Sequence, residues 1–491
     1  MIKVPHSTLL CDIDAHATNT PDKIALVEGD TRITYSQLAS RIKTCASFLQ
    51  TLGLQAGDRI LLSAQKEQEF IYVYFAAHLL GIVNVVVDSA APRERLDYII
   101  GVVKPVICFG DAYQGGACRW IPFGDVPQKE SQGVLELPQL HSTDVADVMF
   151  TTGTTGAPKG VCLSHANISG SACNTNGFIG TQADDIEALA LPLSHSFGLG
   201  RLRCVFSVGA TLVLVSNFAN LKHFFTVLEK ERVTGFGMVP AAWQYIKRFS
   251  GRRIGKFADQ LRYIELGSAA MPIEDKQLLM ELFPTTRVCM HYGLTEASRA
   301  LFSEFHANAN NLDSVGRPAS ALVEVRVLDE KGQQLDPGID GEICVRGNMV
   351  CCSYYLDKDN ESAFYGEWFR TGDWGHQDED GNFYLTGRKK ELINVGGEKV
   401  SPATIEDAIM SLGLKDCACV AVNDPNGVLG EVPKAFLVKG DTDISIDDIK
   451  HRLVQLLPPH EIPVEWEWID SIPRTLSGKI QRLKLKGTSI N

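Results

Sequence analysis

Apolar positions along the first part of the chain follow two different periods. From Leu38 to Leu52 they recur every three or four residues, as on one face of a helix. The preceding Thr34-Tyr-Ser-Gln37 reads as a capping box that starts this helix. Short apolar runs and further helical stretches then alternate, with strands expected at 59–63, 83–87 and 106–109 and helices at 70–80 and 93–102. Strands alternating with helices predict an α/β fold with mostly parallel strands.

The same alternation returns in the middle of the chain. Strands are expected at 188–191, 211–215, 235–239, 263–266 and 287–291. Short polar or glycine-containing segments end three of them, at 192–195, 267–270 and 292–296. Ligands of open α/β sheets bind beyond the carboxyl ends of the strands. We therefore expect these three segments to line one cleft, together with the loop at 150–160.

The pattern changes twice in the second half of the chain. From about residue 322, short apolar runs are separated by turn signals such as Asp378-Glu-Asp-Gly381, which indicates a small β subdomain over about 322–389. After Gly387-Arg-Lys-Lys390, helical and strand patterns begin again. We expect a large N-terminal domain of layered α/β sheets at 1–389 and a smaller α+β domain at 390–491.

Composition narrows the class of protein. The chain has 491 residues, too many for one core, so two or more domains are expected. A net charge of -12 argues against a general binder of nucleic acid or of an anionic membrane. No basic segment followed by an apolar run opens the chain, and no run of about twenty apolar residues occurs, so neither a secretory signal nor a membrane span is expected. The 13 scattered cysteines lack zinc-ligand spacing and are interpreted as reduced thiols of a cytoplasmic protein.

The loop from Phe150 to Gly160 carries the first candidate chemistry. It holds glycines that expose backbone N–H groups, threonine hydroxyls and Lys159, a set of donors that suits a polyphosphate. It is not a Walker A loop, because Pro158 stands where that motif has its second glycine. Taken alone, a Gly/Thr loop of this kind is more often a flexible surface loop than a binding site.

Further motifs follow this loop in a fixed order. They are Tyr292-Gly-Leu-Thr-Glu296, Thr371-Gly-Asp373, Gly387-Arg388 and Pro473-Arg-Thr-Leu-Ser-Gly-Lys479. With the Thr/Gly-rich loop they resemble the adenylate-forming superfamily of acyl-CoA synthetases, adenylation domains and luciferases. The resemblance covers essentially the whole chain. It implies that a carboxylic acid is activated with ATP and Mg²⁺ to an acyl-adenylate, with release of pyrophosphate, and is then passed to a thiol, foremost that of CoA.

The resemblance also implies roles for individual residues. Thr295 would bond the α-phosphate and Glu296 would hold Mg²⁺, which favours carboxylate oxygens. Tyr292 would stack on adenine, Asp373 would bind the ribose and Arg388 would assist at the nucleotide. The remaining residues expected at ATP or AMP are Thr151, Thr152, Gly153, Thr154, Thr155, Gly156, Lys159, Gly267, Ser268, Ala269, His291 and Gly293.

Lys479 is the residue expected to drive adenylation, by bridging the attacking carboxylate and the α-phosphate. By the same resemblance, the C-terminal domain is mobile and rotates about Lys390. Some relatives carry aspartate at that hinge, so the lysine matches only part of the family. After the rotation Gly396 and Gly397 would lie beside the thiol channel.

The acyl pocket is expected behind His195, which resembles an aromatic gate. Candidate lining residues are Phe236, Met238, Val239, Ala241 and Ser268. The gate segment lacks the aspartate with which amino-acid-activating relatives bind the α-ammonium, so an α-amino acid is disfavoured. Arg201 and Arg203 follow the gate. They either read an anionic or hydroxylated substrate or, as such arginines more often do, reach the surface.

Three alternatives to a CoA ligase stay open from the sequence. The acceptor thiol could be the phosphopantetheine of an acyl or peptidyl carrier protein. The chain could be a nucleotide-binding relative without activity, although intact Lys479, Glu296 and Lys159 count against this. An oxidative, luciferase-like activity is not required by any residue. The partners expected are a small carboxylic acid, ATP and CoA, without nucleic acid or a membrane span, in a monomer or homodimer.

Overall fold

The computed structural model describes residues 8–110, 118–127, 135–151, 158–440, 444–474 and 480–486. It divides into two compact units. The first consists of Met1–Val325 and Val345–Phe369, and the second of Arg326–Cys344 and Arg370–Asn491. Each unit is described by itself.

The first unit contains an eight-stranded sheet in the order β14-β13-β12-β11-β9-β10-β1-β2. Its strands are β1 (Ile24–Glu28), β2 (Thr31–Thr34), β9 (Ile186–Leu189), β10 (Thr211–Leu214), β11 (Gly235–Met238), β12 (Tyr263–Leu266), β13 (Arg287–Tyr292) and β14 (Leu301–Glu304). All neighbours from β13 to β1 are parallel, and only the edge strands β14 and β2 run antiparallel to their neighbours. The predicted α/β class with mostly parallel strands is confirmed.

A second sheet of the first unit has the order β17-β8-β7-β4-β3-β5-β6. Its strands are β3 (Arg59–Ala64), β4 (Val83–Asp88), β5 (Ile107–Phe109), β6 (Arg119–Ile121), β7 (Val145–Phe150), β8 (Gly160–Ser164) and β17 (Ser353–Tyr354). β7 and β8 pair antiparallel up to Phe150 and Gly160. The Thr/Gly-rich loop therefore joins two strands of a hairpin, whereas a Walker A loop leads from a strand into a helix.

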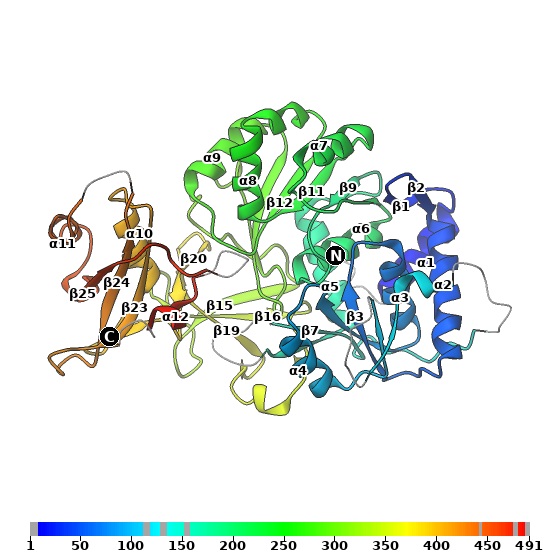
Figure 1. Ribbon diagram of the computed structural model, residues 1–491, viewed down its shortest axis with the longest axis horizontal. Coiled ribbons are helices and arrows are strands. Elements are labelled where there is room, and N and C mark those ends of the chain that lie inside the picture. Colours follow the sequence, from blue (N-terminus) through cyan, green and yellow to red (C-terminus); the bar gives the residue numbers. More distant parts are fainter. Residues whose placement is uncertain are drawn as a thin grey trace. The chain divides into compact units, whose positions relative to one another are not determined.

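Helices between these strands supply much of the core. They are α1 (Leu9–Asn19), α2 (Tyr35–Thr51), α3 (Gln68–Leu79), α4 (Arg93–Val103), α5 (His165–Ile179), α6 (Ser196–Val208), α7 (Leu221–Lys230), α8 (Pro240–Ser250) and α9 (Ile273–Leu282). The predicted capping box is present, because Thr34 and Gln37 satisfy each other's backbone N–H groups at the start of α2. Figure 1 shows α7, α8 and α9 together beside β11 and β12. Phe224, Trp243 and Leu279 of these helices are fully buried in that core.

A further sheet has the order β15-β16-β19-β18, with β20 beside β19. Its strands are β15 (Val323–Leu328), β16 (Gly341–Gly347), β18 (Phe364–Tyr365), β19 (Trp368–Gln377) and β20 (Phe383–Arg388). β15, β16 and β19 run across the sequence boundaries of the two units. Short strands and turns thus occupy the region where a β subdomain was predicted.

The second unit continues with a hairpin, a three-stranded sheet and short helices. These elements are β21 (Ile393–Val395), β22 (Glu398–Val400), α10 (Pro402–Met410), β23 (Asp416–Asn423), β24 (Glu431–Val438), α11 (Ile446–Leu453), β25 (Glu465–Trp468) and α12 (Arg482–Lys486). The short 3₁₀ helices of the chain are η1 (Phe123–Asp125), η2 (Arg253–Phe257), η3 (Asp357–Asp359) and η4 (Pro459–Glu461). Ile405, Ile409 and Ile449 lie in a separate core of this unit.

Two predicted properties concern the whole chain. Within the part of the chain that the structure describes, no helix has both the length and the apolarity needed to cross a bilayer. All thirteen cysteines are free thiols.

Candidate active site

Three of the predicted site segments follow neighbouring strands. The segments 192–195, 267–270 and 292–296 come after β9, β12 and β13, which lie in the parallel series β9-β11-β12-β13. The carboxyl ends of parallel strands meet at one edge of a sheet. The structure therefore gathers these segments at that edge, as the sequence predicted.

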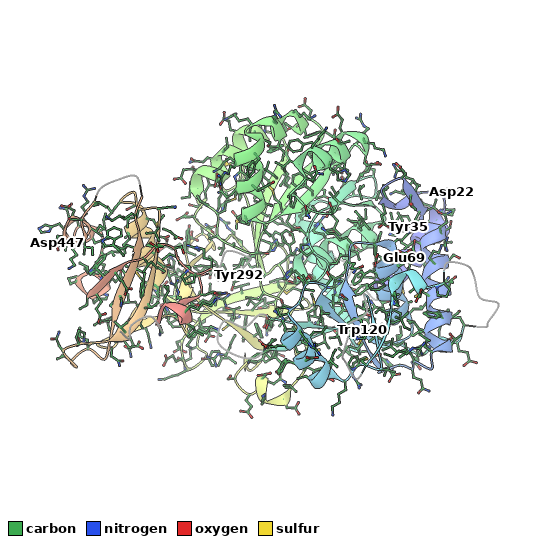
Figure 2. The ribbon with its side chains drawn as sticks, viewed as in Figure 1. Asp22, Tyr35, Glu69, Trp120, Tyr292 and Asp447 are labelled. Atoms are coloured by element: carbon green, nitrogen blue, oxygen red, sulfur yellow. The ribbon has the colours of Figure 1, made fainter. Side chains whose placement is uncertain are left out.

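The predicted adenine wall is tightly built. Gly267 is buried, and a Cβ at this position would overlap the ring of His291. Ser268 has φ 77°, a left-handed conformation that is uncommon for residues other than glycine. Such backbone strain is concentrated at functional sites. Tyr292, labelled in Figure 2, is buried at the end of β13, and Ala269 is half-buried.

Glu296 and Lys159 both contact one tyrosine, Tyr354. The Tyr354 hydroxyl donates to Glu296 Oε1 at 2.8 Å, and Lys159 Nζ lies 4.9 Å from the centre of the Tyr354 ring. Lys159 also pairs with Asp359 at 3.2 Å and is 44% exposed. Because the Lys159 ammonium is half-exposed, solvent screens this pair and it contributes little to stability. Tyr354 and Asp359 were not among the predicted residues.

The donors at this position fit the expected ligands. Glu296 offers a carboxylate, the oxygen ligand that Mg²⁺ prefers, and Tyr354 fixes its orientation. Thr295, immediately before it, is half-buried and carries a hydroxyl. Carboxylate, hydroxyl and ammonium groups are suited to a nucleoside triphosphate bound with its metal ion.

The predicted gate residue precedes helix α6. His195 is exposed and is the residue immediately before the helix. The Ser194 hydroxyl donates to Asp88 Oδ2 at 3.3 Å, at the end of β4. Arg95 donates to the carbonyl of Phe150 at 3.1 Å, where the Thr/Gly-rich loop begins. Because β4 pairs with β7, Asp88 and Phe150 lie at the ends of adjacent strands, and the gate segment adjoins this pair of strand ends.

The predicted acyl-pocket residues lie in different surroundings. Phe236 and Met238 are fully buried on β11, and the Phe236 ring packs 5.4 Å from that of Phe224. Val239 is half-buried, whereas Ala241 is exposed. Their contribution to an acyl pocket stays a prediction.

A first buried ionic cluster lies beneath the start of the Thr/Gly-rich loop. We call Asp147, Arg203, Tyr74 and His78 the Asp147 cluster. Arg203 pairs with Asp147, which also accepts from Tyr74 at 2.7 Å and lies 2.8 Å from His78 Nε2. Burial raises the pKa of Asp147, but Arg203 and the other donors outweigh it and leave the pKa at about 2. The cluster fixes β7 against α3 and α6.

A second buried ionic cluster lies beneath the adenine wall. We call Glu187, Arg201, Tyr263, Glu265, Arg299 and His291 the Glu265 cluster. Arg201 pairs with Glu187 and lies 3.2 Å from Glu265, and Arg299 binds Glu265 at 2.7 Å. Burial lowers the pKa of His291, although Glu265 lies beside it, so that the ring is neutral near pH 7. Two carboxylates thus face two guanidinium groups.

The arginines after the gate do not reach the surface. Arg201 is 0% exposed and Arg203 is 5% exposed, so the expectation that they extend to the surface is wrong. They point to different strands, because residues two positions apart lie on different sides of a helix. The sequence held a signal for both clusters: Asp147, Glu187 and Glu265 each interrupt an apolar strand, and a buried charge requires a partner.

The second unit contains the predicted ribose residue and hinge. The Asp373 carboxylate is buried and lies 2.6 Å from Arg388 Nε, so the structure brings these two predicted residues together. Lys390 is exposed, one residue after Lys389, which pairs with Glu342 at 2.9 Å.

The predicted thiol-channel glycines form a turn in the same unit. Gly396 and Gly397 have φ 61° and 105° and connect β21 to β22. A two-residue hairpin turn with positive φ at both positions favours glycine.

Several predicted residues lie outside the described part of the chain. They are Thr152, Gly153, Thr154, Thr155, Gly156 and Lys479. The flanking residues are described: Thr151 N–H donates to the carbonyl of Lys159 at 2.9 Å, and Arg474 bridges to Ile480.

Comparison with known proteins identifies the class. The AMP-binding enzyme family matches residues 13–355, and the AMP-binding enzyme C-terminal domain matches residues 404–479. The chain therefore belongs to the AMP-binding enzyme family. This confirms the predicted adenylate-forming superfamily.

Individual relatives are similar over nearly their whole length. The chain is 29% identical to a 2-succinylbenzoate–CoA ligase of Bacillus licheniformis, with 95% of this chain and 97% of the relative covered. It is 28% identical to the long-chain-fatty-acid–CoA ligase FadD13 of Mycobacterium tuberculosis, with 96% of each covered.

A solved structure supports the fold and the class of ligand. The o-succinylbenzoate CoA synthetase of Bacillus subtilis, solved with its acyl-adenylate, shares 26% identity, a TM-score of 0.86 and 98% coverage of both chains. The same relative has been solved with AMP and with ATP and a magnesium ion. The predicted fold, the predicted class of AMP-forming acid–thiol ligase and its ligands ATP and Mg²⁺ are confirmed.

Proposed function

We propose that this chain activates a carboxylic acid with ATP, releases pyrophosphate and transfers the acyl group from AMP to the thiol of CoA. The observation that carries the proposal is the gathering of three predicted site segments at the carboxyl ends of β9, β12 and β13. The relatives named as CoA ligases support CoA as the acceptor.

Electrostatics explains why the reaction needs these residues. A carboxylate and a triphosphate are both anions, so the site must supply positive charge and hydrogen-bond donors where they meet. In the proposal, Lys159 and the Thr/Gly-rich loop bind the β- and γ-phosphates and Thr295 binds the α-phosphate. Glu296 holds Mg²⁺, which neutralises phosphate charge. Lys479 bridges the carboxylate and the α-phosphate.

The nucleoside part is proposed to bind between Tyr292 and the segment that follows β12, with Asp373 on the ribose. The burial of Tyr292 and of the Asp373 carboxylate supports this, because both side chains are held in fixed positions. His195 is proposed to gate the acyl pocket.

The reaction is tested by acid-dependent pyrophosphate release. The purified chain is supplied with ATP, Mg²⁺ and one of four acids: acetate, dodecanoate, 4-coumarate or 2-succinylbenzoate, with CoA added or omitted. We expect one acid to raise pyrophosphate release at least tenfold and CoA to yield its thioester. Lys479→Ala should abolish release, because the charge at the α-phosphate is lost, yet form thioester from supplied acyl-adenylate.

Lys484→Ala is the matched control, because Lys484 is exposed in the same C-terminal tail. It should retain activity. Absence of acid-dependent release with every acid tested, or equal loss of both half-reactions in Lys479→Ala, would contradict the proposal. Thioester formation only with a phosphopantetheinylated carrier protein would show that the acceptor is the carrier protein and not CoA.

We further propose domains at 1–389 and 390–491 that rotate about Lys390 between the two half-reactions. The exposure of Lys390 supports this, since its backbone can rotate without uncovering a core. Lys390→Pro fixes φ and should therefore leave adenylation intact while slowing thioester formation at least tenfold. Lys390→Ala, which removes the charge alone, should be close to wild type in both assays. Normal thioester formation in Lys390→Pro would refute the hinge.

A further inference from the structure

Arg299 lies where three of the proposed site segments approach one another. Its side chain is 1% exposed, and its backbone has φ 58°, in the left-handed region. A non-glycine residue in this conformation costs on the order of 1–3 kcal/mol, which the surrounding contacts must offset. None of the proposed catalytic roles uses this arginine.

One end of the arginine holds the gate helix. Arg299 Nη2 donates to the carbonyl of Phe197 at 3.1 Å, and the guanidinium lies 5.1 Å from the centre of the Phe197 ring. Phe197 is the second residue of α6 and follows His195 by two positions. The guanidinium therefore fixes the first turn of the helix that carries the gate.

The other end of the arginine holds the strand beneath the adenine wall. Arg299 Nε donates to Glu265 Oε1 at 2.7 Å, and Glu265 lies on β12 two residues before Gly267. The same carboxylate oxygen is 2.7 Å from His291 Nδ1, next to Tyr292. The His291 ring meets the Phe197 ring edge-on, with centroids 4.6 Å apart.

The backbone of Arg299 also contacts a proposed site segment, the turn after β13. The turn that contains the proposed metal ligand folds back on it, because a Cβ at Gly293 would overlap Arg299 N. Leu294 N–H also donates to the carbonyl of Ala297 at 3.0 Å, which closes the turn. A shift of this turn is therefore transmitted to the guanidinium.

We propose that Arg299 is a positioning residue that couples the gate segment to the nucleotide-binding ends of β12 and β13. The inference rests on the proposed function and adds a structural connection between the gate of the acyl pocket and the nucleotide site. The guanidinium is planar and presents its donors in a fixed fork, so Phe197 and Glu265 move together. A nucleotide that displaces β12 or the turn after β13 thereby changes the position of the gate.

Two variants perturb this link in different ways. Arg299→Lys keeps the positive charge opposite Glu265 but has no planar fork to hold both partners. Gly200→Ala retains Arg299 and adds a methyl group on α6 that overlaps Arg299 Nη1 and pushes the guanidinium away. The second variant keeps every buried charge and tests the link even if the first does not fold. Gly177→Ala is the matched control, because its Cβ meets no atom within 4 Å.

The measurement needs no knowledge of the acid. Hydrogen–deuterium exchange of residues 193–199 is followed with and without α,β-methylene-ATP and Mg²⁺, and the affinity for this nucleotide is measured by calorimetry. In the wild type and in Gly177→Ala, the nucleotide should change exchange of this segment at least about fivefold. In Gly200→Ala and Arg299→Lys, the nucleotide should bind within about threefold of the wild-type affinity, while the change in exchange falls below twofold.

Each other outcome has a definite meaning. A nucleotide-dependent change in exchange of wild-type size in both variants would overturn the coupling role of Arg299. Absence of any change in the wild type, with the nucleotide bound, would overturn it as well. Failure of the wild type to bind the nucleotide would refute the proposed function itself, and the inference with it.

Discussion

The Asp147 cluster and the Glu265 cluster both stabilise buried carboxylates, but they differ in the partners that a carboxylate keeps when one partner is removed. Each places at least one carboxylate on a buried strand that leads to a segment proposed to hold nucleotide. Asp147 pairs with one guanidinium and is further bound by Tyr74, His78 and Asn84. In the Glu265 cluster, Glu187 and Glu265 instead share the charges of Arg201 and Arg299.

The difference lies in what remains when one charge is removed. Asp147 keeps hydrogen-bond donors on α3 after loss of its arginine, whereas Glu187 keeps only the Tyr263 hydroxyl among the members of its cluster. Ion pairs that share partners are coupled, so a single substitution affects several of them. The Glu265 cluster is therefore the more rigid and the more vulnerable of the two, which suits a link between gate and nucleotide.

The largest expected effect separates the two clusters directly. Arg201→Met leaves an uncompensated buried carboxylate and should lower the free energy of unfolding by about 3–5 kcal/mol. Arg203→Met should cost only about 2 kcal/mol, because Tyr74 and His78 still donate to Asp147. Urea-unfolding midpoints followed by tryptophan fluorescence give the comparison.

The double variant Glu187→Gln with Arg201→Met tests the cause of this difference. It removes both charges of one pair and should recover part of the free energy of unfolding that Arg201→Met loses. Equal losses for the two arginine variants, or the reverse order, would show that the remaining donors of Asp147 contribute nothing.

Local signals were sufficient to predict part of this architecture. The Thr34 capping box and the polar segments after the strands are encoded within a few neighbouring residues. Each appears where the sequence indicated. The strand predicted at 188–191 begins instead at Ile186, because Arg201 neutralises Glu187 and so permits a charged residue within a buried strand.

The partners within the clusters could not be predicted. Arg201 on α6 meets Glu265 on β12, 64 positions later in the chain, only through the tertiary packing of the helix on the sheet. Tyr354 reaches Glu296 from a segment that lies 58 positions away. Sequence spacing carries no information on such pairs, so Tyr354, which orients Glu296, was not predicted.

A second prediction concerns the loss of stability in acid near the Asp147 cluster. His165 lies beside the Asp147 cluster, with its ring next to that of His78. Burial, and after it the nearby His78, lowers the pKa of His165 to about 4, whereas Asp147 and Asp144 act to raise it. The unfolded chain binds a proton at this histidine below pH about 6.5, whereas the folded chain does so only near pH 4. Stability is therefore lost as the pH falls through this window, by about 2 kcal/mol between pH 7 and pH 5.

His165→Phe should flatten this part of the stability curve, measured by thermal or urea unfolding between pH 4.5 and 7.5. His141→Gln serves as the control, because His141 is exposed. A curve of unchanged slope in His165→Phe would show that another group causes the acid sensitivity.

The smallest effect concerns the tyrosine of each cluster. The Tyr74 hydroxyl donates to Asp147 and accepts from Arg203 at 2.8 Å, so Tyr74→Phe breaks contacts on both sides and should cost about 2 kcal/mol. The Tyr263 hydroxyl donates to Glu187 at 2.6 Å and accepts from Arg201 only at a longer 3.4 Å, and Glu187 keeps both of its bonds from Arg201. Tyr263→Phe should therefore cost about 1 kcal/mol, measured by the same urea midpoints. A larger loss in Tyr263→Phe than in Tyr74→Phe would contradict this order and would make the Tyr263 hydroxyl an essential partner of Glu187.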